Sequence, residues 1–336
     1  MKVLAFFNNK GGVGKTTLAY HFANMLSIQG IKTLVLDLDP QANLTSMFLK
    51  DESIERLLDE ENGTIYKAIL PVIEGQGPVV LPKLQQIRSN LRLISGDLSL
   101  SEIEDTLSIE WARGNDSNPT TFRRSISVTT IFWQVIQAAN GPNDDIVILD
   151  VGPNLGAINR LALLCSDYVV VPLAPDLFSL KGLSNMGPKI AEWQLDWTSR
   201  REKAERIGLN VPSGTMQPIG YVLSRFSVRA DRPAKAFARW SARIPQEFLR
   251  LLRQASESAP SLDADPYRLA TMKDYRSLMP MAMEAHKPMF SLTPADGAIG
   301  GHQKAVEACY ADYENLVTAV RFKMATDEAS RIFVAS

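Results

Sequence analysis

The stretch Lys10-Gly11-Gly12-Val13-Gly14-Lys15-Thr16-Thr17 decides the fold of this 336-residue chain. An apolar run at 3–7 leads into it, and a helix-compatible stretch at 16–29 leads out of it. A strand, a glycine-rich turn and a helix start form a phosphate cradle, because backbone N–H groups and the helix dipole converge on an anion. In this interpretation Lys15 holds the β- and γ-phosphates, and Thr16 supplies a hydroxyl to Mg²⁺. A glycine turn without a ligand is the alternative, and the three spaced glycines before Lys-Thr argue against it.

This loop departs from the common P-loop pattern G-x-x-x-x-G-K-[ST] at its first position. The pattern has glycine where this chain has Asn9, and the next position carries a second lysine, Lys10. The second lysine is the feature that separates this loop from the ordinary one.

Composition places few further limits on the function. Hydrophobic residues make up 45% of the chain and charged residues 22%, as in a soluble globular protein. The net charge of −1 predicts no global attraction to nucleic acid or acidic lipid, so any such binding needs a local patch. The two cysteines, Cys165 and Cys309, match no metal spacing and favour a reducing, cytoplasmic compartment. We expect neither a signal peptide nor a membrane span.

Carboxylates follow two apolar runs that are typical of buried parallel strands. The run 33–38 ends in Asp37-Leu38-Asp39-Pro40, and the run 145–150 ends in Asp150. Ligands of open α/β sheets bind at the carboxyl ends of the strands, so we expect Asp39 to face the phosphates. An ordinary Asp-Pro turn is the alternative for Asp39. Asp150 fits a Walker B pattern, in which the carboxylate orients Mg²⁺ or its water ligands.

The rest of the chain alternates strand and helix patterns without an internal repeat. This order predicts an α/β fold with one doubly wound, mostly parallel sheet flanked by helices. Among the other elements we expect a mobile loop at 114–121, a helix beginning near Lys181 and a closing helix at 302–324. Val306, Tyr310, Tyr313 and Val317 recur at helical spacing on that closing helix and predict docking on the core.

A basic stretch follows the predicted strand at 217–223. Between positions 225 and 253 eight arginines and lysines face two acidic residues, a local charge of +6. Six of the basic residues fall into two sets with helical spacing, and each set would share one face of a helix. We interpret these six as DNA contacts, with a solvated helical face as the alternative: Arg225, Arg229, Arg232, Lys235, Arg239 and Arg243.

With these motifs the chain resembles the ParA/MinD family of deviant Walker A ATPases, and most of all the ParA/Soj-type partition ATPases. The resemblance rests on the loop at 10–17, on Asp37 to Asn43, and on Asp150 to Gly156, where the family more often has two prolines. It covers nearly the whole chain as one P-loop domain, 1–336, with less family-like elaborations near 108–145, 193–216 and 245–270. Longer members carry a DNA-binding domain before the loop, which we do not expect here because the loop begins at residue 10.

The resemblance implies an ATP-driven dimerisation switch. In the ATP state two subunits form a homodimer, and Lys10 of each reaches the phosphates of the other. By the same comparison Asp39 positions the attacking water, and Asp150 supports Mg²⁺. The dimer would bind DNA nonspecifically on the nucleoid, and a ParB-like or adaptor protein would stimulate hydrolysis. The cargo, whether plasmid, chromosome or a protein assembly, and the residues that contact adenine are not indicated by the sequence.

Two other functions use the same core. A MinD-like membrane switch needs a basic amphipathic helix at the C-terminus, whereas positions 328–336 carry one basic and one acidic residue. A metabolic enzyme of the superfamily, such as an iron–sulfur reductase, needs paired cysteines, and Cys165 lacks a suitable mate. We therefore expect partition or positioning, with no membrane partner.

Overall fold

The computed structural model describes residues 1–139, 145–224, 234–275 and 277–335, and it describes their side chains except at 234–236 and 329–335. Within these residues eight strands form one sheet in the order β3-β4-β2-β5-β1-β6-β7-β8. All neighbours are parallel except β3 and β4, which confirms the predicted doubly wound class. The strands are β1 (Lys2–Phe6), β2 (Thr33–Asp37), β3 (Gln85–Arg88), β4 (Leu91–Ile94), β5 (Ile146–Asp150), β6 (Tyr168–Leu173), β7 (Gln217–Ser224) and β8 (Arg268–Met272).

Helices cover both faces of this sheet. The α-helices are α1 (Lys15–Ile28), α2 (Asn43–Phe48), α3 (Asp51–Asp59), α4 (Ile65–Glu74), α5 (Glu104–Arg113), α6 (Pro119–Thr129), α7 (Ile131–Ala139), α8 (Ala157–Leu164), α9 (Leu177–Arg206), α10 (Ala234–Ser241), α11 (Ile244–Leu252), α12 (Leu278–Ala285) and α13 (Gly301–Ala335). The short 3₁₀ turns are η1 (Leu98–Ile103), η2 (Leu262–Ala264), η3 (Met289–Ser291) and η4 (Pro294–Asp296).

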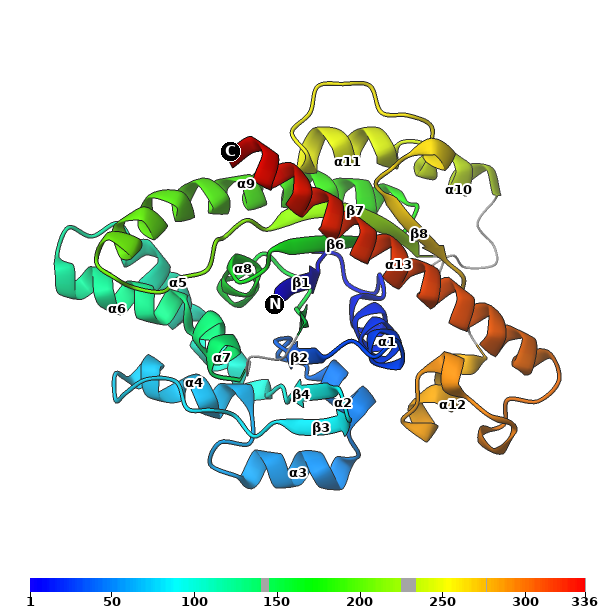
Figure 1. The fold of residues 1–336 in the computed structure, drawn as a ribbon, viewed down its shortest axis with the longest axis horizontal. Helices are drawn as coiled ribbons and strands as arrows, with labels where there is room; N and C mark the ends of the chain where they lie inside the picture. Colours follow the sequence, from blue (N-terminus) through cyan, green and yellow to red (C-terminus); the bar gives the residue numbers. More distant parts are fainter. Residues whose placement is uncertain (140–144, 225–233, 276, 336) are drawn as a thin grey trace.

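The strand side chains alternate between two apolar cores, one on each face of the sheet. In β1, Val3 and Ala5 join the core under α4 to α9 and α11, whereas Leu4 and Phe6 join the core under α1, α2, α12 and α13. This alternation follows from the period of two along a strand, and it explains why the run is apolar on both faces. Figure 1 shows α13, in red, running diagonally across the molecule to the region of α12.

The closing helix docks on the core as the sequence predicts. Tyr313 and Val317 are fully buried, and Val306 and Tyr310 are partly buried against the same core. The helix is longer at both ends than the predicted 302–324, because α13 runs from Gly301 to Ala335. No helix among the described residues combines the length and the apolarity needed to cross a membrane.

Two predicted boundaries are wrong, each because a side chain caps a helix earlier than expected. The expected loop at 114–121 ends early, since α6 begins at Pro119 and Asn118 Oδ1 accepts from the N–H groups of Thr120 and Thr121 at 2.9 and 3.2 Å. The helix expected near Lys181 begins at Leu177, because Asp176 Oδ1 accepts from the N–H of Ser179 at 2.9 Å. The two edge strands, β3 and β8, were not predicted from the sequence.

Candidate nucleotide-binding site

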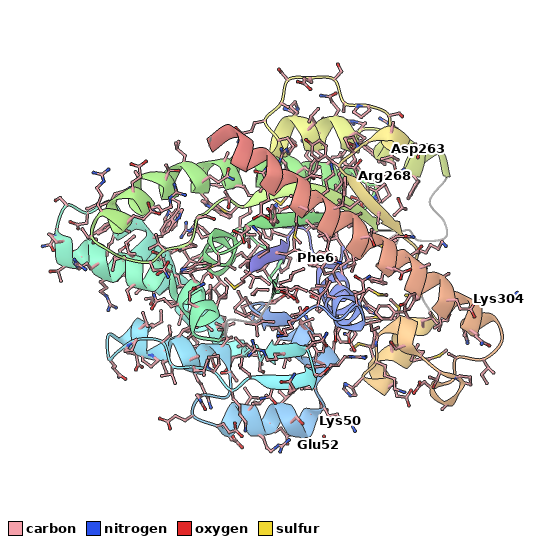
Figure 2. All side chains as sticks on the ribbon, in the orientation of Figure 1. Phe6, Lys50, Glu52, Asp263, Arg268 and Lys304 are labelled. Atoms are coloured by element: carbon pink, nitrogen blue, oxygen red, sulfur yellow. The ribbon has the colours of Figure 1, made fainter. Side chains whose placement is uncertain are left out.

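The glycine-rich loop connects the centre of the sheet to the start of α1. Phe6, the last residue of β1, lies near the centre of the molecule (Figure 2). Gly12 and Gly14 have φ values of 71° and 87°, in the left-handed region that L side chains rarely adopt. Gly14 is the N-cap of α1, so the backbone turns sharply and directs the first N–H groups of the helix outward. The loop therefore has the conformation that a phosphate cradle requires.

A cavity of about 410 Å³ lies over this loop. Its lining combines the loop and Asp39 with methionine side chains of α2 and α12. The lining residues are Gly11, Gly12, Gly14, Lys15, Thr16, Thr17, Asp39, Gln41, Asn43, Ser46, Met47, Pro153, Met279 and Met283. All the predicted loop residues line the cavity except Lys10 and Val13. The side chain of Val13 is buried.

Lys15 is a buried cation, with 6% of its surface exposed. Its Nζ donates a hydrogen bond to the carbonyl oxygen of Lys10 at 3.2 Å. Burial lowers the pKa of Lys15, while the charges of Asp150 and Asp39 oppose that shift. A bound phosphate would stabilise the charged form of Lys15, because it brings negative charge close to a desolvated ammonium group.

Three carboxylates gather beside the loop at the ends of β2 and β5. Asp37 and Asp150 are fully buried and lie opposite each other in the parallel ladder. Neither oxygen of Asp150 makes a hydrogen bond of ordinary geometry among the described residues, although the Thr16 hydroxyl is near enough to lower the pKa of this carboxyl. Burial, followed by the neighbouring charge of Asp37, raises the pKa of Asp150 well above its usual range. A buried carboxylate without a partner is costly unless a cation binds there.

Asp37 is a member of this cluster to which the sequence assigned no role. Its Oδ2 accepts from the N–H and the hydroxyl of Thr45, each at 2.8 Å, while its Oδ1 has no partner among the described residues. Burial raises the pKa of Asp37 to about 7, although the two bonds from Thr45 act in the opposite direction. The only signal in the sequence was the position of Asp37 at a strand end.

Asp39 combines the two interpretations that the sequence left open. Its Oδ1 accepts from the N–H of Gln41 at 3.0 Å, as in a turn, and its side chain also lines the cavity. The Oδ2 atom has no hydrogen bond within the described part of the chain. One oxygen is therefore fixed by the turn, and the other is available to a ligand or a water molecule.

The donor set fits Mg²⁺ when a nucleotide supplies further oxygens. No group of three or more His, Cys, Asp or Glu side chains suited to a metal occurs in the described ranges. Mg²⁺ usually takes one or two carboxylates and completes its shell with phosphates and water. Asp150, with two unpartnered oxygens, and the nearby Thr16 and Asp39 match that requirement.

Lys10 points away from the cavity of its own chain. Its Nζ forms an ion pair with Asp176 Oδ2 at 2.6 Å and lies 3.5 Å from Ser179 Oγ, at the start of α9. Its backbone N–H donates to Asn8 Oδ1 at 2.9 Å, which fixes the start of the loop. The sequence did not predict the roles of Asp176 and Asn8, because both contacts depend on how distant elements meet.

The predicted DNA-contact residues are described only in part. Arg225, Arg229 and Arg232 lie outside the described residues, as does the side chain of Lys235. The guanidinium carbons of Arg239 and Arg243 lie 5.1 and 5.4 Å from the ring centroid of Trp240. Arg243 follows the end of α10 and is the residue before α11, so this set is not on one continuous helix as the spacing suggested.

The fold and the loop together define a P-loop protein of the deviant, two-lysine class. A family model described as an AAA domain matches residues 1–201, and the chain belongs to this family, among the ParA-type partition ATPases. The chromosome partitioning protein ParA of Caulobacter vibrioides is 32% identical over 186 residues, covering 55% of this chain and 61% of that protein. An uncharacterised protein of Methanocaldococcus jannaschii is 28% identical over 289 residues, which cover 86% of this chain and 93% of that protein.

Solved structures show the same architecture. A protein of Corynebacterium diphtheriae has a TM-score of 0.61 at 25% identity and covers 85% of this chain and 97% of its own. A putative plasmid partition protein of Borrelia burgdorferi bound to AMPPNP has a TM-score of 0.55 at 19% identity, and the match covers 96% of this chain and 98% of that one. The pNOB8 ParA bound to nonspecific DNA has a TM-score of 0.54 at 16% identity, covering 97% and 99%. At these identities the last two demonstrate the fold alone.

Proposed function

We propose that this protein is an ATPase that dimerises with ATP, binds DNA without sequence preference in that state, and partitions or positions a cargo. The observation that carries the proposal is the cavity in which the loop, Lys15 and Asp39 meet beside the unpartnered Asp150. A buried cation and a row of buried carboxylates around helix-start N–H groups is the arrangement that Mg²⁺-bound triphosphate requires.

The nucleotide would lie with its triphosphate on the loop and its adenine against the methionine side chains that line the cavity. Lys15 would neutralise the β- and γ-phosphates, and Thr16, Asp39 and Asp150 would hold Mg²⁺, which supplies charge neutralisation on the phosphates. Methionine side chains make favourable sulfur contacts with aromatic rings, so Met279 and Met283 suit a purine. The sequence did not indicate the adenine contacts, and we assign them to these two methionines, which lie more than 260 positions beyond the loop.

For hydrolysis, we assign Asp39 to orient the attacking water. Phosphoryl transfer depends mostly on positioning and electrostatic stabilisation, so a carboxylate with one fixed and one available oxygen is suited to this task. The turn bond from Gln41 fixes the carboxylate, and the cavity gives water access to it.

Lys10 would act on the nucleotide of a second subunit. In its own chain it does not line the cavity, and its ammonium group is only partly buried beside Asp176. Between two ATP-bound subunits that face each other, a lysine from each would neutralise charge that otherwise repels them. Exchange of the Asp176 contact for a phosphate contact would then link dimerisation to ATP.

Nonspecific DNA is the partner that fits Arg239 and Arg243, both exposed and without an ion pair in the described part of the chain. The DNA-bound pNOB8 ParA shares the fold, which supports this assignment by analogy.

A ParB-like or adaptor protein would stimulate hydrolysis, and the protein would be cytoplasmic and associated with the nucleoid. We also infer that residues 1–336 work as one domain, because α13 packs against α1.

The test combines a phosphate-release assay with fluorescence anisotropy of a labelled duplex. The parent should hydrolyse ATP and bind DNA with ATP but not with ADP. Asp39→Ala should bind DNA with ATP yet hydrolyse poorly, whereas Asp51→Ala, at an exposed position on α3, should behave as the parent. A parent that binds anionic vesicles instead of DNA would replace the proposal with a membrane switch, and a parent without ATP hydrolysis would refute it.

A further inference from the structure

Another, smaller cavity lies at the end of the strands opposite the nucleotide site. Its volume is about 160 Å³, and it lies between the start of β7, the end of α11 and the last turns of α13. Because β7 runs parallel to β6 and β6 parallel to β1, the first residues of β7 are at the end of the sheet away from the P-loop. The lining residues are Ile219, Arg253, Tyr267, Lys323, Thr326 and Asp327.

Two cations meet in this cavity over one aromatic ring. The guanidinium carbon of Arg253 lies 5.4 Å from the ring centroid of Tyr267, and Lys323 Nζ lies 5.0 Å from it. Both distances are within the range in which the ring quadrupole attracts a cation. The ring therefore attracts two like charges to the same place, and their mutual repulsion disfavours this arrangement.

Neither cation forms an ion pair with a carboxylate within the described ranges. Arg253 donates from Nη1 to the carbonyl oxygen of Pro218 at 3.1 Å, which is a neutral acceptor. Lys323 Nζ makes no hydrogen bond or ion pair within the described ranges. Burial lowers the pKa of Lys323, and the charge of Arg253 lowers it further, whereas Asp265 acts in the opposite direction.

Two carboxylates, Asp265 and Asp327, lie near the two cations. Asp265 accepts from the hydroxyl of Tyr221 at 2.6 Å and from the N–H of Tyr267 at 3.0 Å. Asp327 is the one carboxylate among the lining residues, so the lining carries two positive charges and one negative charge. The charge of Asp265 also reaches Lys323, so the two cations and the two carboxylates balance overall, and the cavity has a volume of about five water molecules.

We propose that this cavity, with Arg253 and Lys323 converging over Tyr267, binds a phosphate group. A tetrahedral oxyanion offers oxygens to both cations at once and relieves their repulsion, as arginine and lysine do in other phosphate sites. The phosphate belongs either to a free anion or to a nucleic-acid backbone. The assignment does not depend on the ATPase activity proposed above.

The experiment uses the full chain saturated with Mg²⁺ and ADP, so that the P-loop is already filled. Inorganic phosphate is titrated by calorimetry at constant ionic strength, with chloride as the reference. The parent should bind one phosphate, Lys323→Met should weaken binding at least tenfold, and Lys323→Arg should restore it to within a few-fold. Lys304→Met is the matched control, since Lys304 is exposed near the other end of α13 (Figure 2).

A second arm repeats the variants with a labelled duplex in ATP. If Lys323→Met weakens duplex binding and Lys304→Met does not, the phosphate is that of the nucleic-acid backbone. If only the binding of inorganic phosphate is lost, the ligand is a free anion. The proposal is overturned if neither phosphate nor duplex binding depends on Lys323, or if Lys304→Met has the same effect as Lys323→Met.

Discussion

Replacing Asp37 by asparagine should stabilise the nucleotide-free protein more at pH 8 than at pH 5. The folded protein holds a proton on Asp37 up to about pH 7, whereas an unfolded aspartate loses it near 3.8. Between these values the folded state binds more protons than the unfolded state, so this group lowers the free energy of unfolding as the pH rises. A difference of about three pKa units corresponds to roughly 4 kcal/mol over the whole window.

Between pH 5 and pH 8 the expected loss from Asp37 is about 2.5 kcal/mol, since most of the window lies above pH 5. Asparagine cannot ionise, and its carbonyl oxygen can still accept both bonds from Thr45. The difference in free energy of unfolding between Asp37→Asn and the parent should therefore grow by about this amount from pH 5 to pH 8.

The assay is urea unfolding at both pH values, followed by tryptophan fluorescence in the absence of Mg²⁺ and nucleotide. The difference between variant and parent is the informative quantity, because burial lowers the pKa of His21 to about 4 and gives the parent an opposing pH dependence. Asp51→Asn, at an exposed position, is the control. If the difference for Asp37→Asn is the same at pH 5 and pH 8, the buried carboxylate does not carry the raised pKa.

Three further predictions address the proposed ligands. Lys15→Ala should abolish ATP binding in calorimetry, and binding within a few-fold of the parent would contradict the P-loop assignment. Replacing Met279 and Met283 by alanine should weaken the binding of ATP several-fold and leave the binding of inorganic triphosphate unchanged, since sulfur–aromatic contacts are worth about 0.3–1.5 kcal/mol each. Equal losses of affinity for both ligands would place the adenine elsewhere. Reversing Arg239 and Arg243 to glutamate should reduce DNA affinity and flatten its salt dependence, measured by anisotropy at several salt concentrations. Unchanged DNA binding would leave these arginines as a solvated surface.

Local sequence patterns predicted the fold and the loop that lines the candidate site. Buried parallel strands and a glycine loop have strong local signals, so β1, β2 and β5 and the loop were predicted in place. The helix α9 begins four residues before the predicted start, because the side chain of Asp176 caps it at Leu177. The edge strand β8 has mixed exposure and lacks a continuous apolar run.

The contacts that complete the site depend on elements far apart in the chain. Met279 and Met283 line the cavity only because α12 packs against α13, which in turn packs against α1. The ion pair of Lys10 joins positions 166 residues apart. The Arg253 and Lys323 pair likewise depends on where α11 and α13 meet. No spacing rule reveals such pairs, since each residue alone reads as an ordinary surface or core position.

The central claim is that ATP joins two chains through Lys10, and sedimentation velocity tests it most directly. With Mg²⁺ and ATP the parent should sediment at twice the 37.2 kDa of one chain, and with ADP as a monomer. Lys10→Ala should bind ATP with the affinity of the parent and remain a monomer, because removal of one partner of a buried charge pair typically costs about 3–5 kcal/mol. A Lys10→Ala protein that dimerises with ATP as the parent does would contradict the claim.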